Sequence, residues 1–348
     1  MQNYIAKIYL HNIQNNARAF CQTTGKPLCA VVKADAYGHG AVEVVNALSG
    51  IADCFAVALL QEALAIQTAV CGKSVLVFTP PMDEEEVRFG AEHGFVLSVT
   101  DYGVALLVSK TALAYRLPVR VHLKANTGMN RYGMNLQTLG KACKLLCQNP
   151  FVSVEGLYSH LYGTTRESAE NQRSAFLRAK AVCERYFSGV GCHLSATYGA
   201  LLGERFTFDM TRIGLGLYGY LPPVAEAKRV RLEKGMAVYA PVTATRKYVF
   251  GGAGYGNALP TPPEGGRLYT LRIGYADGVL RRQENGVDGY VLNAGNTCMD
   301  ACVRIGKEKK GRLIPVLTDA DETARVCETI AYETLCAITR RATRIYEN

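Results

Sequence analysis

A lysine follows a short apolar stretch near the start of the chain, within the segment Ala30–Gly40. Residues 29–32 predict a buried strand, Lys33 stands at its C-terminal end, and two glycines mark a turn before a helix that begins at Ala41. Burial removes solvent from a lysine and lowers its pKa, and a neutral amine can bond to an aldehyde or accept a proton. An isolated lysine would more often reach water, so the rest of the sequence must decide between these interpretations.

Other residues that could take part in binding or catalysis also follow apolar strands that the sequence predicts. These strand-end residues are Lys124, Arg131, His160, Thr197, Arg212 and Gly214. Each alone would more often be an ordinary polar residue. In an α/β barrel, however, the C-terminal ends of all strands meet at one face, where catalytic residues gather. Their joint occurrence therefore predicts a catalytic site at that face.

Alternating strands and helices must position these side chains. Apolar strands are predicted at residues 29–32, 54–59, 74–78, 95–99, 119–123, 152–157, 192–195 and 208–213, and helices at 41–48, 62–70, 84–93, 101–113, 136–147 and 167–186. Eight strands with intervening helices over roughly 200 residues predict an eight-stranded TIM-like α/β barrel. The alternative is a doubly wound open sheet, which is disfavoured because no Gly-x-Gly-x-x-Gly turn follows an early strand.

The pattern changes at Leu221-Pro222-Pro223. Short β-rich segments follow, at residues 236–242, 267–273 and 289–293, and Gly and Pro clusters separate them. The sequence therefore predicts two domains. The first is a barrel at 9–222, and the second is a mostly β domain at 223–348 that includes an N-terminal strand within 1–8.

Composition excludes several classes of protein. The 348 residues are 49% hydrophobic and 20% charged, and no apolar run approaches the ~20 residues of a membrane span. The start of the chain lacks the features of a secretory signal, so a cytoplasmic protein is expected. The twelve cysteines and six histidines show no metal-ligand spacing, which predicts reduced thiols and no metal. The net charge of +9 comes from scattered residues, which favours an anionic small molecule over nucleic acid.

Nine segments resemble, in order along essentially the whole chain, the motifs of the alanine racemase family, whose members are pyridoxal-phosphate enzymes. These segments are Ala30–Gly40, Val121–Arg131, Gly156–His160, His193–Thr197, Met210–Gly219, Gly254–Gly256, Gly274–Gly278, Cys298–Asp300 and Thr329–Glu333. The chain departs from the family pattern at Asn126, where Asp is usual, and at Thr197, where Ser is usual. Leu161-Tyr162-Gly163 also replaces the usual residues after His160.

The resemblance implies a set of site residues. Lys33 would hold pyridoxal 5'-phosphate covalently, and Lys33 and Tyr255 would be the two catalytic bases. The other implied cofactor contacts are Tyr37, Arg131, His160, Thr197, Arg212, Gly214, Leu215 and Tyr332, and the implied substrate contacts are Arg131, Tyr275 and Met299.

Finer roles follow from the same resemblance. Arg212 would face the ring nitrogen of the cofactor, and a hydrogen-bonded chain from Tyr255 through His160 to Arg212 would favour the Tyr255 phenolate. Lys124 would carry a carbamate that orients Arg131. Tyr255 and Met299 would reach the opposite subunit, so a homodimer is implied.

The implied reaction is the racemisation of L- and D-alanine, which would supply D-alanine for bacterial peptidoglycan. Three alternatives stay open at this point. A racemase of serine or of many amino acids would use the same residues. A non-catalytic pyridoxal-phosphate protein of cofactor homeostasis would need only one domain. A barrel decarboxylase would pair an acidic residue with the ring nitrogen in place of Arg212.

Overall fold

The computed structural model describes residues 3–163, 165–222, 224, 230–248, 255, 266–279 and 296–348, which form two compact units. The barrel unit consists of Ile13–Ala36 and Ala41–Glu233, and the β-rich unit consists of Met1–Asn12, Tyr37–Gly40 and Lys234–Asn348. The domain boundaries that the sequence predicts, at 222 and 223 with residues 1–8 in the second domain, stay a prediction.

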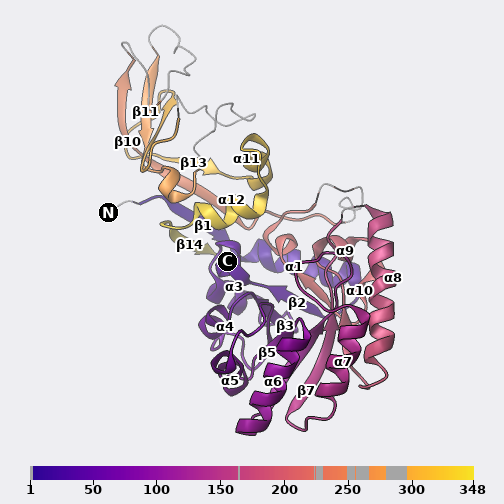
Figure 1. Ribbon diagram of the computed structural model, residues 1–348. Coiled ribbons are helices and arrows are strands. Elements are labelled where there is room, and N and C mark those ends of the chain that lie inside the picture. Colours follow the sequence, from indigo (N-terminus) through magenta and orange to yellow (C-terminus); the bar gives the residue numbers. More distant parts are fainter. Residues whose placement is uncertain are drawn as a thin grey trace. The chain divides into compact units, whose positions relative to one another are not determined.

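Eight parallel strands form the sheet of the barrel unit in the order β8-β7-β6-β5-β4-β3-β2-β9 (Figure 1). They are β2 (Leu28–Val31), β3 (Cys54–Val57), β4 (Val75–Val77), β5 (Val96–Val99), β6 (Val119–Lys124), β7 (Val152–Tyr158), β8 (Gly191–His193) and β9 (Thr211–Ile213). The Arg212 amide donates to the Ser195 carbonyl at 2.9 Å, and the Asp209 amide donates to the Cys192 carbonyl at 3.0 Å. These two bonds link the two ends of the strand order and close the sheet, so the predicted barrel is confirmed.

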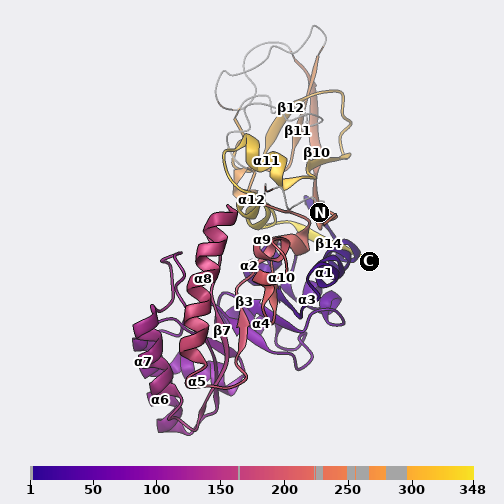
Figure 2. The same ribbon diagram turned by 90° about the vertical axis from the view of Figure 1, so that its right-hand side faces the viewer.

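Helices alternate with the strands and cover the outside of the barrel (Figure 2). They are α1 (Leu10–Thr24), α3 (Ala41–Leu48), α4 (Leu60–Ile66), α5 (Glu84–Glu92), α6 (Tyr102–Tyr115), α7 (Leu136–Leu146), α8 (Arg166–Cys183), α9 (Thr197–Leu201) and α10 (Glu204–Thr207). Short elements at the strand ends are α2 (Lys33–Tyr37) and the 3₁₀ turn η1 (Leu215–Tyr218). Helices α5 to α8 each begin at a polar side chain that accepts the amide three residues further on, namely Asp83, Asp101, Asn135 or Thr165.

The core of the barrel unit explains its unbroken apolar strands. Strands β2, β4 and β5 are buried along their whole length, because helices cover one side and the barrel interior lies on the other. The predicted strand at 208–213 is too long. Phe208 has φ 52°, so the extended backbone of β9 begins only at Thr211.

The β-rich unit is built on a sheet in the order β12-β11-β10-β1-β14, with β13 also paired to β10. The β1 and β14 pair is parallel and the other pairs are antiparallel. The elements are β1 (Ile5–Tyr9), β10 (Met236–Lys247), β11 (Arg267–Leu271), the 3₁₀ turn η3 (Tyr275–Asp277), β12 (Cys302–Ile305), β13 (Leu313–Leu317), α11 (Ala320–Val326), α12 (Ala331–Ile338) and β14 (Thr343–Glu347). The predicted segments 236–242 and 267–273 contain β10 and β11, and residues 289–293 lie outside the described residues.

Two further observations concern the whole described chain. All twelve cysteines are free thiols. Across the described ranges, every helix is too short or too polar to cross a membrane.

Candidate active site

The strand register brings the predicted strand-end residues to neighbouring positions in the barrel unit. Lys124 on β6 is paired with Tyr158 on β7, and Tyr158 is paired with His193 on β8. On the other side of the closure, Arg212 on β9 is paired with Cys29 on β2, four residues before Lys33. The adjacent strands therefore place these side chains at one end of one barrel, as the sequence predicts.

Arg212 is held by a dense set of acceptors in the barrel interior. Its side chain is 2% exposed. Nη1 donates to the Nδ1 atom of His193 at 2.7 Å and to its carbonyl at 2.9 Å, whereas Nη2 donates to the carbonyls of Ser159 at 2.6 Å and Leu194 at 3.1 Å. Burial lowers the pKa of Arg212, yet a guanidinium stays charged at any physiological pH. The site thus contains a fixed positive charge whose orientation is set by backbone carbonyls.

His193 and His122 continue the hydrogen-bonded chain that begins at the Arg212 guanidinium. Because the guanidinium only donates, Nδ1 of His193 must accept, and the ring proton of His193 must lie on Nε2. That Nε2 lies 3.0 Å from Nδ1 of His122, which then accepts in turn. Burial, with Arg212 nearby, lowers the pKa of His122 to about 3 and holds the pKa of His193 well below its usual value. Both rings are therefore neutral at neutral pH, and the positive charge stays on Arg212.

Tyr158 is the aromatic centre of this cluster. Its ring stacks on His193 with centroids 5.1 Å apart, and its hydroxyl lies 2.7 Å from the Ser98 hydroxyl. The Nζ atom of Lys124 lies 4.2 Å from the Tyr158 ring centroid, and Cζ of Arg212 lies 5.5 Å from it. The negative face of an aromatic ring attracts cations, so Tyr158 stabilises the positive charge of Arg212, and the amine of Lys124 lies over the same ring.

Lys124 is itself buried, with 8% of its surface exposed. Burial lowers its pKa well below the usual range, and the charges of Arg212 and Arg131 lower it further. His160 follows β7 and is half-buried, and its pKa is lowered for the same physical reasons. Burial holds its pKa well below the usual value, with contributions from Arg212 and Lys124. The amine of Lys124 and the ring of His160 therefore favour their neutral forms.

The loop that carries Arg131 is organised by Asn126, one of the departures from the family motif. Its Oδ1 accepts the amides of Gly128 at 3.0 Å and Asn130 at 3.2 Å, and its Nδ2 donates to the Asn130 side chain at 2.8 Å. An aspartate could accept the same two amides. Asn126 therefore retains the acceptor role, while the negative charge near Lys124 is lost. Arg131 is exposed at the edge of this loop.

The backbone directly after Lys33 has an unusual conformation. Ala34, Asp35, Ala36 and Tyr37 have φ between 52° and 54°, so α2 contains a left-handed turn built from residues with side chains. Such a conformation costs about 1–2 kcal/mol per residue for L-amino acids. Lys33 is half-buried at the start of this turn. Strained backbone of this kind clusters at active sites, where the surrounding contacts must hold it in place.

Thr197 and η1 form the opposite edge of the same barrel end. The Thr197 hydroxyl accepts the Gly216 amide at 3.2 Å, which ties α9 to η1. Among the hydrogen bonds of the described residues, the amides of Gly214 and Leu215 have no acceptor. Free amides that lead into a helical turn, beside a hydroxyl, are suited to an anion such as phosphate.

Four predicted site residues of the β-rich unit are exposed, whereas a fifth, Tyr37, is buried. The exposed fraction is 64% for Tyr255, 41% for Tyr275, 54% for Met299 and 42% for Tyr332. The Tyr255 carbonyl accepts the Asn296 amide at 2.9 Å, while its flanking glycines lie outside the described residues. Tyr37 belongs to this unit, and its ring centroid lies 5.9 Å from that of Tyr332.

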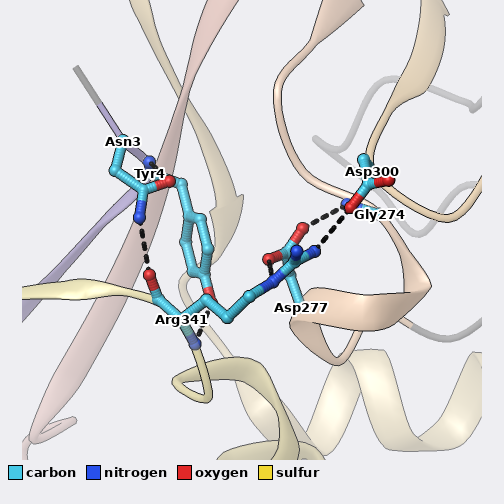
Figure 3. A network of polar contacts seen from close by, with 6 residues as sticks. All are labelled: Asn3, Tyr4, Gly274, Asp277, Asp300 and Arg341. Carbon is cyan, nitrogen blue, oxygen red and sulfur yellow. Dashed lines mark hydrogen bonds and ion pairs between the residues drawn. The ribbon is translucent and has the colours of Figure 1, made fainter. Parts of the chain in front are cut away.

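A polar network fixes the turns that carry Tyr275 and Met299 (Figure 3). The Arg341 guanidinium donates to the Asp277 carboxylate at 2.7 Å and to the Asp300 carboxylate at 2.8 Å. Asp277 ends η3, the turn that Tyr275 begins, and Asp300 directly follows Met299. One arginine therefore joins both turns.

Backbone contacts bring the same two turns together. The Tyr275 amide donates to the Cys298 carbonyl and the Ala276 amide donates to the Met299 carbonyl, both at 3.0 Å. A Cβ at position 274 would lie 2.2 Å from the Met299 carbonyl oxygen, so only glycine fits there.

Several residues of the site were not predicted as functional from the sequence. His122 and Tyr158 lie within segments that resemble family motifs, but the sequence assigns no role to them or to Ser98, Glu62 and Arg341. Buried polar types inside apolar strands were the available signal for His122 and Ser98, because such groups need partners. Arg341 lies 41 residues from Asp300, and nothing in the sequence pattern links them.

The positive charges at this end of the barrel are those of Arg131 and Arg212. Within the described chain, neither guanidinium forms a salt bridge with a carboxylate. Cations without a counter-ion at one barrel end attract an anionic ligand, and Lys33 adds an amine that can bond covalently. The arrangement is therefore suited to hold an anionic aldehyde together with a carboxylate substrate.

Comparisons with known proteins agree with this geometry. Residues 8–222 match the family model "Alanine racemase, N-terminal domain", and residues 235–346 match "Alanine racemase, C-terminal domain". The chain is 30% identical to an alanine racemase of a Nostoc species over 96% of this chain and 92% of that protein. It is 32% identical to the catabolic alanine racemase of Pseudomonas putida over 96% of both chains. The solved alanine racemase of Streptomyces coelicolor is similar with a TM-score of 0.89 and 29% identity, over 99% of this chain and 98% of that one.

Proposed function

The chain belongs to the alanine racemase family, and from this premise we propose that it interconverts L- and D-alanine with pyridoxal 5'-phosphate bound at Lys33. The observation that carries the proposal is the cationic end of the barrel, where Arg131 and Arg212 have no carboxylate partner within the described chain. These charges suit the phosphate and phenolic oxygens of the cofactor and the carboxylate of an amino acid.

The side chains at this end of the barrel fit the cofactor. The Thr197 hydroxyl and the amides of Gly214 and Leu215 would bind the phosphate, because three neutral donors at a helical turn stabilise an anion. Arg212 would face the ring nitrogen. Since a guanidinium has only donors and keeps its proton, that nitrogen would stay unprotonated. Pyridoxal phosphate, when bound, withdraws electrons from the amino acid and weakens its Cα–H bond.

Two bases would then exchange the proton at the substrate Cα. Lys33 would act on one face through Nζ, and Tyr255 would act on the other face through its phenolic oxygen. His160 supports this assignment, because its lowered pKa leaves a neutral ring with a nitrogen that can accept a hydrogen bond from the Tyr255 hydroxyl. The described hydrogen bonds of Arg212 go to His193 and to carbonyls, so the link from His160 to Arg212 stays a prediction.

Arg131 and the exposed aromatic residues would complete the substrate site. Arg131 would hold the carboxylate and the phenolic oxygen of the cofactor, since a guanidinium binds such groups with two parallel bonds. Tyr275 and Met299 would limit the substrate side chain, and Tyr37 with Tyr332 would contact the cofactor. The exposure of Tyr255 and Met299 in a single chain supports a homodimer in which these two side chains enter the site of the partner subunit.

Lys124 is the proposed site of a carbamate. Carbamylation needs a neutral amine, which adds to carbon dioxide to give a carbamate anion and one proton. The lowered pKa of Lys124 supports that reaction. The resulting charge would replace the one that Asn126 lacks and would orient Arg131. Incorporation of ¹³C-bicarbonate, detected by NMR and absent after Lys124→Met, would test this modification.

The test of the whole proposal is a chiral assay of alanine with purified protein and added pyridoxal phosphate. We expect equal final amounts of D- and L-alanine from either enantiomer. Serine and lysine, assayed in parallel, distinguish a specific enzyme from a broad racemase. Cofactor binding without inversion of any amino acid would favour the non-catalytic alternative, and release of carbon dioxide would favour a decarboxylase. In a bacterial cytoplasm, the proposed product would supply D-alanine to peptidoglycan.

A further inference from the structure

The strained turn after Lys33 is tied to the next strand–helix unit of the barrel by one carboxylate. Oε1 of Glu62 accepts the Ala34 amide at 2.7 Å. Oε2 of the same side chain accepts the amides of Ala58 at 2.7 Å and Leu59 at 3.2 Å. The Glu62 side chain is half-buried, and its bond to the Ala58 amide is partly buried, whereas the bonds to Ala34 and Leu59 lie at the surface.

The two carboxylate oxygens of Glu62 accept hydrogen bonds from different segments of the chain. Oε2 makes the ordinary contact of a glutamate at the third position of a helix, where it accepts the amides that precede α4. Oε1 is not needed for that cap and instead binds the first residue of the left-handed turn. Hydrogen bonds to a carboxylate are about twice as strong as neutral ones, which suits an anchor that must hold an unfavourable backbone conformation.

Two further hydrogen bonds of the turn lie within its own segment. The Ala36 amide donates to the Val32 carbonyl at 2.9 Å, and the Asp35 carboxylate accepts the Ala41 amide at 2.7 Å. Both bonds link neighbours in sequence, so they shape the turn without fixing it against another strand. Glu62, which lies 28 residues from Ala34, provides such a fixed point.

We propose that Glu62 is a positioning residue for Lys33. By holding the Ala34 amide, it keeps the left-handed turn in place, so that Nζ of Lys33 stays aligned with the bound aldehyde and with the substrate Cα. This proposal rests on the proposed function of Lys33 as the cofactor lysine. Glu62 itself touches neither substrate nor cofactor in this account.

The chain contains a matched control for helix capping. Glu86 occupies the third position of α5, as Glu62 does in α4, and its Oε2 accepts the Met82 amide at 2.9 Å. Among the described hydrogen bonds, Glu86 makes no contact with the turn after Lys33. Glu62→Ala and Glu86→Ala therefore both remove a capping glutamate, but only the first removes the anchor of Ala34.

The experiment compares Glu62→Ala, Glu62→Gln and Glu86→Ala with the wild-type holoenzyme. Borohydride reduction in the presence of pyridoxal phosphate, followed by peptide mass spectrometry, measures the cofactor bound to Lys33. Hydrogen exchange of the peptide that spans residues 33–41 measures the order of the turn. We expect Glu62→Ala to weaken the apparent cofactor affinity at least about tenfold and to speed exchange in that peptide, because a charge-assisted bond is lost. The cofactor affinity of Glu62→Gln should lie between those of the wild type and Glu62→Ala. The affinity of Glu86→Ala should match that of the wild type within about twofold.

The outcomes separate the two proposals. A Glu62→Ala protein with wild-type labelling and wild-type exchange would overturn the role of Glu62 alone. The same would follow if Glu86→Ala reduced labelling as much as Glu62→Ala does. Wild-type protein that takes up no cofactor at Lys33 would instead overturn the proposed function, and the role of Glu62 with it.

Discussion

The barrel unit and the β-rich unit present their candidate site residues in opposite ways. In the barrel unit, Arg212 and Lys124 are 2% and 8% exposed, and carbonyls, histidines and a tyrosine ring surround them. In the β-rich unit, Tyr255 and Met299 are 64% and 54% exposed and extend from short turns or an isolated bridge. The first unit thus contains a preorganised electrostatic site, whereas the second presents the side chains of Tyr255 and Met299 largely exposed.

This difference in exposure suggests that the two units have different roles, one in cofactor binding and the other in enclosing the substrate. Fixed charges in a water-poor site act strongly on a bound ligand and need no reorganisation during the reaction. Exposed aromatic residues on turns are better suited to enclose a substrate and to exclude water once a partner subunit is in place. Mutations in the barrel unit should therefore affect cofactor binding, whereas those in the β-rich unit should affect turnover or substrate affinity with the cofactor still bound.

The largest expected effect is that of Lys33→Ala in the barrel unit. Removal of the amine should abolish covalent attachment of pyridoxal phosphate and reduce racemisation by at least about 10⁴-fold, because one group serves as both attachment point and base. Absorbance of the bound cofactor and the chiral assay measure the two effects. Lys144→Ala, at an exposed position of α7, is the control. Full activity of Lys33→Ala would show that the barrel unit does not contain the covalent site.

The next effect tests the β-rich unit. Tyr255→Phe should keep the cofactor on Lys33 and lose at least about 100-fold in rate in both directions, since one proton-transfer group is removed. The spectrum of the bound cofactor should stay unchanged. Tyr102→Phe, an exposed tyrosine of the barrel unit, controls for a lost hydroxyl. Undiminished racemisation by Tyr255→Phe would contradict the two-base mechanism.

Some features of the two units can be predicted from the sequence and others cannot, depending on whether they follow from local patterns or from long-range contacts. Lys33, Arg212 and Thr197 could be predicted, because they follow apolar strands whose ends must meet in a barrel. The left-handed turn after Lys33 could not, since three of its four residues carry no sign of such a backbone and it depends on contacts with the distant Glu62. The strand β14 was missed because its exposed and half-buried residues give no apolar alternation. Long-range pairs such as Asp300 and Arg341 leave no trace in local spacing.

A third effect, of intermediate size, concerns acid stability. The pKa of His122 is lowered to about 3, so its ring is neutral in the folded barrel unit at pH 5, and burial also holds the pKa of His193 and that of His160 well below their usual values. In the unfolded chain these histidines bind protons below about pH 6.5. The unfolded state then holds more protons, so the free energy of unfolding falls as pH decreases, by about 1.4 kcal/mol per pH unit for each histidine.

Urea unfolding followed by circular dichroism between pH 7 and pH 5 measures this dependence. His122→Gln should reduce the slope by the contribution of one proton, whatever its effect on stability at pH 7. His11→Gln, in the β-rich unit, is the control. An equal change of slope in both variants would mean that the acid sensitivity is not specific to the barrel unit.

The smallest expected effect concerns the arginine that joins the turns of Tyr275 and Met299. Arg341→Met removes the bonds to Asp277 and Asp300. Partly exposed ion pairs contribute little to stability, but this pair of bonds aligns the turns of two proposed substrate contacts, so the KM for alanine should rise about three- to tenfold. Attachment of the cofactor at Lys33 should not change. Arg312→Met, which breaks the exposed pair with Glu308, serves as the control for a lost surface charge.

The two aspartates refine this last prediction. Asp277 is 6% exposed and also accepts the Gly274 amide, whereas Asp300 is 65% exposed and has a screened charge. Asp277→Asn should therefore raise KM more than Asp300→Asn, which should stay within about twofold of the wild type. If Arg341→Met instead released the cofactor while KM stayed constant, the turns of the β-rich unit would contribute to cofactor binding. The separation between a cofactor-binding barrel unit and a substrate-enclosing β-rich unit would then be wrong.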